Sequence, residues 1–201
     1  MSDVVAVAMA YALGCVQTGY YLVLALTGRD LRSIGSGATG ARNAGRVLGW
    51  KGFVITLIVD AGKGALAVAV PVWMGASPIT IALSLVAVTV GHVFPIHLWF
   101  SGGRGVAVGM GALAVFDIRL FGVLVAVTLC VWVVIRRFQA AGLAGFAAVP
   151  IAAWLLRHPP SALASVGGMS LIVLFAHRSR IADLLRCPLG ADRGPSANIG
   201  D

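Results

Sequence analysis

The sequence predicts an all-α integral membrane protein with about seven transmembrane helices, and three observations support this fold class. Hydrophobic residues occupy 59% of the 201 positions and charged residues only 11%, and the mean hydropathy is +0.96. Soluble globular domains carry roughly 25% charged residues, so this composition excludes an ordinary soluble domain. Apolar runs recur along the chain, and the basic residues gather in alternate connections between them.

Seven apolar runs follow one another with short connections. A helix needs about 20 apolar residues to cross a bilayer, and fewer where it is buried or half-length. The predicted spans are Val4–Leu26, Gly52–Met74, Pro78–Trp99, Val106–Phe116, Leu120–Ile135, Ala140–Leu156 and Ala162–Ala176. The fourth run is too short to cross alone, so we expect a half-helix, a re-entrant segment or a span extended into Gly102–Gly105.

The basic residues predict the orientation. One set of alternating connections holds only Arg119 and Arg157, and Lys63 lies inside a span. The other set holds twelve of the 15 Lys and Arg residues: Arg29, Arg32, Arg42, Arg46, Lys51, Arg104, Arg136, Arg137, Arg178, Arg180, Arg186 and Arg193. Because cytoplasmic connections are enriched in Lys and Arg, we expect the N-terminus outside and the C-terminus in the cytoplasm. This charge suits contact with anionic membrane lipid, and no soluble platform is present that would predict a nucleic-acid partner.

The first run is expected to be a retained span, because no basic region precedes it as in a signal peptide. The connection that follows, residues 29–46, combines four glycines with four arginines. Glycines let backbone amides approach an anion, and arginine binds phosphate with two parallel hydrogen bonds. This pattern alone supports a phosphate site and a flexible positive linker equally. The candidate phosphate-binding residues are Ser36, Gly37, Gly40, Asn43 and Arg46.

The second span contains two residues of opposite charge, Asp60 and Lys63. Their spacing of three places both on one helical face, where they can neutralise each other within the bundle. We therefore expect a structural intramembrane pair rather than a catalytic one, although Lys63 can also reach toward the site.

The third run contains His92, which we expect about two helical turns inside the membrane end of its span. An ionisable group at this depth is costly and is by default a functional candidate. The alternative is a neutral histidine that a neighbouring helix satisfies. Gly102, Gly103 and Arg104 then precede the fourth run, and we expect the amides of this helix start to face an anion.

The last span ends at a third cationic segment, His177-Arg178-Ser179-Arg180-Ile181. Residues 1–186 are predicted to form a single polytopic domain. Residues 187–201, rich in Gly, Pro, Asp and Ser, are expected to be a disordered cytoplasmic tail. Cys15, Cys130 and Cys187 lack metal-ligand spacing, so neither a metal site nor a disulfide is predicted.

Taken in order, these motifs resemble those of the bacterial acyl-phosphate:glycerol-3-phosphate acyltransferase family (PlsY family), small seven-span enzymes of the plasma membrane. The resemblance covers nearly the whole chain, from the first span to residues 177–185. The matching motifs are Gly-Ser-Gly at 35–37 with Gly40-Ala41 and Asn43, Gly-His-x-Phe-Pro at 91–95 followed by Gly-Gly-Arg-Gly, and His-Arg-x-x-Ile at 177–181. Asp60-x-x-Lys63-Gly64 is also similar to the family's second-span signature.

The resemblance implies transfer of an acyl group from acyl phosphate to the 1-hydroxyl of glycerol 3-phosphate, which yields lysophosphatidate and phosphate without a metal or cofactor. Phosphate binding falls to Ser36, Gly37, Arg46 and Arg104, supported by the amides of the glycine loops. Arg178 completes the polar site, and His92 and His177 are the catalytic candidates. All seven acidic residues are aspartates, mostly outside the motifs, so a paired-carboxylate mechanism is disfavoured. The family pattern instead has the substrate's own phosphate assist deprotonation of the attacking hydroxyl.

Several positions depart from the family pattern. Ala38, Thr39 and Arg42 stand where the first motif usually has Asn, often Pro, and Thr. Arg180 replaces the usual Asn of the last motif, and the stretch 137–142, which includes Ala140, replaces one that contains serine. Two alternatives therefore stay open beside the enzyme: a catalytically impaired or re-purposed paralogue that binds a phosphorylated lipid or metabolite, and a transporter of a phosphorylated metabolite. The strongly apolar outer halves of the spans disfavour the transporter.

Overall fold

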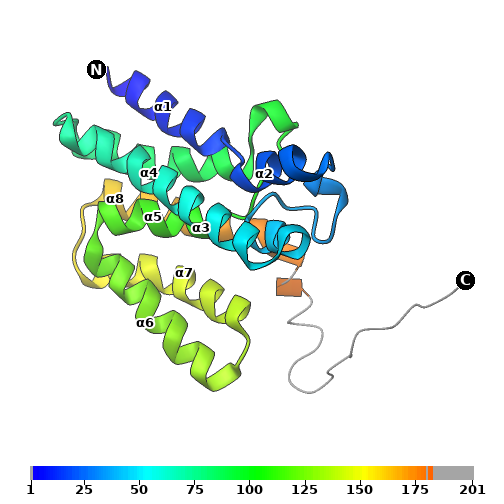
Figure 1. Ribbon diagram of the computed structural model, residues 1–201. Coiled ribbons are helices and arrows are strands. Elements are labelled where there is room, and N and C mark those ends of the chain that lie inside the picture. Colours follow the sequence, from blue (N-terminus) through cyan, green and yellow to red (C-terminus); the bar gives the residue numbers. More distant parts are fainter. Residues whose placement is uncertain (1, 180, 183–201) are drawn as a thin grey trace, which may run out of the picture.

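The computed structural model describes residues 2–179 and 181–182, and these residues form helices and connections without any strand (Figure 1). Their α-helices are α1 (Asp3–Cys15), α2 (Thr18–Thr27), α3 (Ala41–Trp73), α4 (Pro78–Val93), α5 (Val106–Phe116), α6 (Ile118–Ile135), α7 (Phe138–Leu155) and α8 (Pro160–Ala176). Two short 3₁₀ helices, η1 (Leu31–Ser33) and η2 (Ile96–Leu98), lie in the connections. The predicted tail, residues 187–201, and the basic positions Arg180, Arg186 and Arg193 lie outside the described residues.

The helices agree with the predicted fold class. Within the described region, five stretches are long and apolar enough to cross a membrane: Asp3–Thr27, Ala41–Trp73, Pro78–Leu98, Ile118–Ile135 and Phe138–Leu155. The helices α5 and α8 are apolar but shorter, with 11 and 17 residues. At 1.5 Å per residue, α5 is about 16 Å long, roughly half of a 30 Å hydrocarbon layer. The all-α membrane fold is therefore confirmed, with a half-length fourth passage, whereas the orientation of the termini stays a prediction.

The first predicted span is wrong as a single continuous helix. The chain leaves helical geometry at Val16 and Gln17, between α1 and α2. Gln17 is fully buried and its Nε2 donates to the carbonyl of Gly14 at 3.2 Å. The carbonyl of Val16 accepts a hydrogen bond from Lys63 Nζ. Polar side chains inside the bundle thus satisfy backbone groups that the break releases.

The helix α3 begins at Ala41, well before the predicted Gly52. Its 33 residues are kinked at Gly49, where φ is 68° and ψ is −162°, a conformation accessible to glycine but not to ordinary residues. Gly40 is the N-cap of this helix. Asn43 and Arg46, which we predicted on a loop, therefore lie in the first two turns of α3.

The third predicted span extends too far at its C-terminal end. The helix α4 ends at Val93, not at Trp99, because Pro95 has no backbone N–H and restricts the residue before it. His92 consequently lies in the last turn of α4 rather than two turns inside it. It is nevertheless buried, with only 2% of its surface exposed, because the α4–α5 connection folds back over it.

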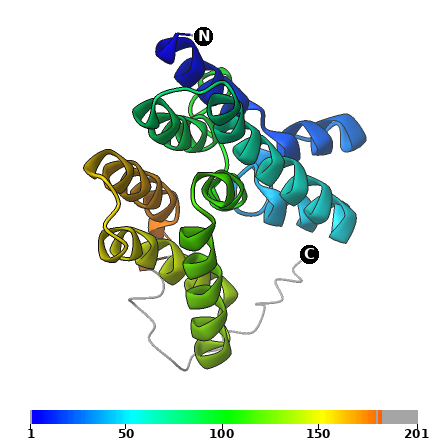
Figure 2. The same cartoon turned by 90° about the vertical axis from the view of Figure 1, so that its left-hand side faces the viewer.

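Close packing around α5 places the ends of the helices together. Figure 2 shows α5 end-on near the centre, with α3 and α4 on one side of it and α7 and α8 on the other. At Gly111 of α5 an added Cβ would lie 1.9 Å from the carbonyl oxygen of Ala61 on α3, so only glycine allows this approach. The buried core includes Leu85, Phe146 and Met169. This packing fixes the ends of α4 and α8 beside the connections that carry the predicted site.

Candidate functional site

The three cationic segments predicted from the sequence meet at one end of the bundle. The amide of Thr39, at the end of the glycine-rich connection, donates to the carbonyl of Gly102 at 3.3 Å. The amide of Gly103 donates to the carbonyl of His92 at 2.9 Å. The positive charge of Arg104 acts on His177 at the end of α8. Segments that are far apart in the sequence therefore form one continuous polar region.

Asn43 holds the glycine-rich connection in shape from inside. It is 2% exposed, and its Nδ2 donates to three carbonyls at 2.8–3.1 Å, those of Leu31, Ile34 and Ala38. Its Oδ1 accepts the amide of Ser36 at 3.2 Å and Arg46 Nη1 at 3.4 Å. Since all of its hydrogen-bonding groups are used by the protein, the structure gives Asn43 a positioning role. Direct contact of Asn43 with substrate stays a prediction.

The glycine-loop amides differ from the expectation that they face phosphate. The amides of Ser36 and Gly37 donate within the loop, to Asn43 Oδ1 and to the carbonyl of Ile34. Gly102 and Gly103 likewise donate to carbonyls at the end of α4. The side chains of Ser36 and Arg46 are both exposed. Side-chain donors rather than these amides are therefore available to an anion.

Gln17 and Thr39 connect the segments of the site. No role for Gln17 was predicted from the sequence. Gln17 Nε2 donates to the carbonyl of His92 at 3.1 Å, and its Oε1 accepts Thr39 Oγ1 at 2.5 Å. Both residues are at most 1% exposed. The signal for Gln17 was a lone amide inside an apolar run, which needs partners when buried. Thr39, noted as a departure from the family pattern, supplies one of those partners.

A buried polar network lies beneath this region. Lys63 Nζ is 2.9 Å from Asp60 Oδ1, the pairing that their spacing predicts, and Thr18 Oγ1 donates to the same carboxylate oxygen at 2.9 Å. Lys63 Nζ also lies 3.0 Å from His92 Nδ1. An ammonium only donates, so Nδ1 must accept, and the network assigns the neutral imidazole with its proton on Nε2. Lys63 thus reaches the site through His92.

Gly103 leaves the space that the His92 ring occupies. A Cβ at position 103 would lie 2.1 Å from His92 Nε2 and within 3 Å of two ring carbons. Contacts this short do not occur between real Cβ atoms and ring atoms, so either the ring or the loop would have to move. The Nε2 edge of His92 therefore faces the Gly-Gly-Arg-Gly segment across a site that requires glycine.

His177 caps the end of α8 and is 5% exposed. Its Nδ1 donates to the carbonyl of Val173 at 2.8 Å, which leaves Nε2 with a free lone pair in the neutral ring. Burial lowers the pKa of His177, and the charge of Arg104 acts in the same direction, against the Val173 hydrogen bond. The environment therefore favours a neutral imidazole that can accept a proton or a hydrogen bond.

Arg178 is placed differently from the other predicted cations. Its guanidinium lies 4.5 Å from the centroid of the Phe175 ring and donates to the Phe175 carbonyl at 3.4 Å. The Phe175 ring in turn lies 6.4 Å from that of Phe94. Arg178 is exposed at the edge of the site in this arrangement, and its predicted contact with substrate stays a prediction.

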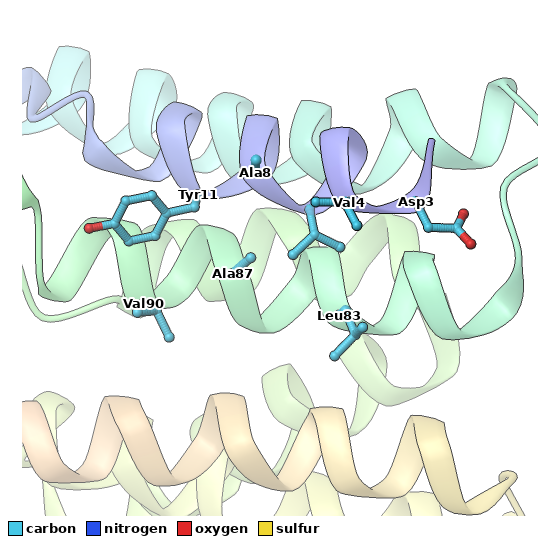
Figure 3. Close-up of a pocket in the computed structure, with 8 residues that line it drawn as sticks. Asp3, Val4, Ala8, Tyr11, Leu83, Ala87 and Val90 are labelled. Carbon is cyan, nitrogen blue, oxygen red and sulfur yellow. The ribbon is translucent and has the colours of Figure 1, made fainter. Parts of the chain in front are cut away.

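An apolar groove of about 610 Å³ runs between α1 and α4 (Figure 3). It is lined by Asp3, Val4, Val7, Ala8, Tyr11, Leu83, Ala87 and Val90. Tyr11 lies at one end, where its hydroxyl donates to the carbonyl of Phe94 at 3.0 Å, and Asp3 lies at the other (Figure 3). A helical rise of 1.5 Å per residue makes the groove about 12 Å long. Its dimensions and lining suit a segment of hydrocarbon chain.

Groups that could bind a metal do not gather in the described part of the chain. No cluster of three or more His, Cys, Asp or Glu side chains occurs among residues 2–179 and 181–182. Cys15 is buried and Cys130 is exposed, and both are free thiols. Cys187 lies outside the described residues.

A family profile described as Glycerol-3-phosphate acyltransferase matches residues 4–187. The chain belongs to the glycerol-3-phosphate acyltransferase family. It is 42% identical over 185 residues, 92% of each chain, to glycerol-3-phosphate acyltransferase 1 of Desulfitobacterium hafniense (strain Y51). It is also 38% identical to the glycerol-3-phosphate acyltransferase of Gluconobacter oxydans (strain 621H), over 88% of this chain and 87% of the relative.

The fold is also that of a glycerol-3-phosphate acyltransferase of known structure. The chain superimposes on the crystal structure of PlsY (YgiH), an integral membrane glycerol 3-phosphate acyltransferase in its glycerol 3-phosphate form, with a TM-score of 0.84. The match covers 92% of this chain and 93% of the other at 26% identity. The family resemblance predicted from the motifs is therefore confirmed.

Proposed function

We propose that this chain transfers an acyl group from acyl phosphate to the 1-hydroxyl of glycerol 3-phosphate, forming lysophosphatidate and inorganic phosphate for phospholipid synthesis. One observation carries the proposal: three cationic or hydrogen-bonding segments meet at one end of a membrane bundle, beside an apolar groove. Both substrates carry phosphate, and one also carries a long hydrocarbon chain. An arrangement of cations next to an apolar groove matches this combination. The family membership supports the same reaction.

The phosphate groups would be held by side chains from two segments. Ser36 and Arg46 offer an exposed hydroxyl and an exposed guanidinium, and Asn43 Oδ1 accepts hydrogen bonds from the Ser36 amide and from Arg46 Nη1. Arg104 supplies positive charge from the Gly-Gly-Arg-Gly segment, next to His177. Guanidinium groups bind phosphate oxygens with paired, charge-assisted hydrogen bonds. Two cations on separate segments provide one partner for each of the two substrate phosphates.

The chemical step needs donors at the carbonyl and a proton acceptor at the hydroxyl. The glycerol 3-phosphate hydroxyl attacks the acyl carbon, a carbon–oxygen bond forms, and the bond from that carbon to the phosphate oxygen breaks. In this proposal the Nε2–H of His92 donates to the acyl carbonyl oxygen, and Nε2 of neutral His177 accepts a hydrogen bond from the attacking hydroxyl and orients it. The hydroxyl proton leaves with the help of a substrate phosphate, which agrees with the scarcity of carboxylates in the predicted motifs.

The hydrocarbon chain of the acyl donor would lie in the groove between α1 and α4. The groove ends at Tyr11, whose hydroxyl donates a hydrogen bond to the carbonyl of Phe94, next to the site. Replacing Ala8 or Ala87 with Phe fills the groove without changing any charged residue. We expect these variants to prefer shorter acyl phosphates than the parent protein does, and an unchanged chain-length profile would remove the groove from the donor site.

The position of the site gives the expected location of the reaction. The segments that form it are those whose basic residues predict a cytoplasmic face, so we place the chain in the bacterial plasma membrane with its N-terminus outside. Cysteine labelling tests this: a cysteine at Ser33, on the exposed glycine-rich connection, should react with a membrane-impermeant reagent only after the cells are opened. Labelling in intact cells would reverse the orientation.

The acyl donor is tested by comparing palmitoyl phosphate, palmitoyl coenzyme A and palmitoyl acyl carrier protein with the same acceptor. We expect lysophosphatidate from the acyl phosphate alone. Product formed equally well from the thioesters would overturn the assignment of the donor while leaving glycerol 3-phosphate as the acceptor.

A further inference from the structure

The connection between α4 and α5 presents three large apolar side chains outward. Trp99 is 86% exposed, Ile96 64% and Phe100 57%. Trp99 and Phe100 both have positive φ angles, 54° and 59°, which bulky residues rarely adopt. We call these three side chains the wedge. Two successive aromatic residues in strained conformations, both directed away from the protein, indicate a purpose other than core packing.

Many backbone amides of this connection are hydrogen-bonded within the protein. Six successive amides, from Leu98 to Gly103, donate to carbonyls within residues 92–98. The accepting carbonyls are those of His92, Val93, Pro95, Ile96 and Leu98. Irregular backbone at membrane depth requires internal partners, because lipid supplies none. These six amides meet this requirement although the side chains of Trp99 and Phe100 are exposed.

The apolar stretch that leads into the connection, Pro78–Leu98, has 21 residues and is about as long as the hydrocarbon layer is thick, so it ends near the surface of that layer. The helix α4 has 16 residues and α5 has 11, so they are about 24 Å and 16 Å long. The hydrocarbon layer is about 30 Å thick. The 21-residue stretch therefore brings the connection to the boundary between the acyl chains and the headgroups. Aromatic side chains are enriched at this boundary in membrane proteins.

The wedge is fixed to the rest of the site. His97, between the wedge residues, stacks on Tyr21 of α2 with a ring separation of 6.1 Å and an interplanar angle of 6°. Arg32 Nη1 donates to the carbonyl of Leu98 at 3.3 Å. Figure 1 shows this connection standing beside α2, at the upper right. Two residues beyond Ser101, Gly103 contacts the His92 ring.

We propose that the wedge is inserted into the headgroup boundary of the bilayer and forms the side entrance through which the lipid-borne substrate reaches the site. The partner is the lipid surface itself, recognised by apolar side chains on a connection whose amides from Leu98 to Gly103 are hydrogen-bonded within the protein. The insertion stands on the exposed side chains, the helix lengths and the backbone hydrogen bonds. The entrance role rests, in addition, on the proposed acyltransferase function.

Tryptophan fluorescence tests the insertion without an activity assay. The chain has five tryptophans, and the Trp99→Phe variant isolates the contribution of Trp99 by subtraction. In phosphatidylcholine–phosphatidylglycerol vesicles, this component should lose most of its emission to lipids brominated near the glycerol end of the acyl chains, and little to aqueous iodide. Adding Phe100→Trp to Trp99→Phe should restore a component with the same behaviour. Quenching by iodide without quenching by bromolipid would overturn the insertion.

Steady-state kinetics in vesicles test the entrance. The double variant Trp99→Ala, Phe100→Ala should raise KM for vesicle-borne acyl phosphate several-fold while leaving kcat and KM for water-soluble glycerol 3-phosphate unchanged. Trp73→Ala is the matched control, because Trp73 is a similarly exposed tryptophan at the far end of α3. Unchanged KM for the acyl donor in the double variant would overturn the entrance role. An inactive parent protein would instead contradict the proposed function, and the fluorescence result would stand.

Discussion

Lys63 Nζ lies 3.0 Å from His92 Nδ1 while it is also 2.9 Å from Asp60 Oδ1. The ammonium therefore links a buried carboxylate on its own helix to an imidazole at the end of α4. This relationship changes the interpretation of a pair that the sequence marked as structural. Lys63 both neutralises Asp60 and holds the tautomer of His92, so its loss should affect stability and activity together.

Replacing Lys63 with Ala should lower the free energy of unfolding by about 3 kcal/mol or more, because it leaves a buried carboxylate unpaired. Thermal unfolding in detergent measures this loss. The double variant Asp60→Asn, Lys63→Ala should lose less stability than the sum of the single variants, since it removes both charges. An intact transition with lost activity would show that Lys63 acts on the reaction and not on the fold.

Replacing Gly103 with Ala should lower kcat at least about tenfold, since an added Cβ collides with the His92 ring and a shift of about 1 Å in a catalytic group is costly. The collision distance is 2.1 Å, to Nε2. Gly62→Ala is the control, because a Cβ there meets nothing within 4 Å. Equal kcat values in the two variants would argue against a role for the position of His92.

Replacing Asn43 with Ala should raise KM for glycerol 3-phosphate and lower the free energy of unfolding by about 1–3 kcal/mol, the cost of unpaired buried polar groups. The loop carbonyls and the Ser36 amide lose their partner. Ser33→Ala removes an exposed hydroxyl of the same connection and should change neither quantity. If KM is unaffected in a folded Asn43→Ala protein, the loop shape does not govern acceptor binding.

Replacing Arg104 with Ala should raise KM for a phosphorylated substrate by about tenfold or abolish turnover, since a hydrogen bond to a charged group contributes about 1.5–3 kcal/mol. The same variant should raise the pKa of His177, because the charge of Arg104 lowers it in the parent protein. The pH dependence of activity would report this second effect. Normal kinetics would remove Arg104 from the site.

Because the pKa of His177 is lowered in the folded state, we expect the protein to lose stability in acid. Burial and the charge of Arg104 lower its pKa in the folded state, whereas the unfolded value is about 6.5. The unfolded chain therefore binds the proton first as the pH falls below about 6.5, and stability decreases until the folded pKa is passed. His177→Asn keeps a donor for Val173 and should show a smaller loss of Tm between neutral and acidic pH. An equal loss in both proteins would contradict this origin.

The sequence was sufficient for the fold where apolar runs have clear ends. Val106–Phe116 was predicted with the bounds that α5 has, because an uninterrupted apolar run is bounded by Gly105 and Asp117. The break at Gln17 was not predicted, since it depends on contacts with Thr39 and with the end of α4 that only the folded bundle provides.

The sequence predicted which residues gather at the candidate site, but not which groups each of them binds. Motif order indicated that the segments of Ser36, Arg104 and His177 belong to one site, and the structure brings them together. Whether an amide faces a ligand or the protein depends on local turns that the motif does not specify. Asn43 illustrates this, because its side chain is hydrogen-bonded to the glycine-rich connection and to Arg46, whereas its predicted contact with substrate stays a prediction.

The proposed reaction is tested most directly by phosphate release from the purified protein in lipid vesicles given palmitoyl phosphate, with and without glycerol 3-phosphate. Lysophosphatidate is followed in the same samples by mass spectrometry. We expect release that depends on glycerol 3-phosphate and is matched mole for mole by lysophosphatidate. Release that is independent of the acceptor, or no lysophosphatidate from a demonstrably folded preparation, would contradict the proposed reaction.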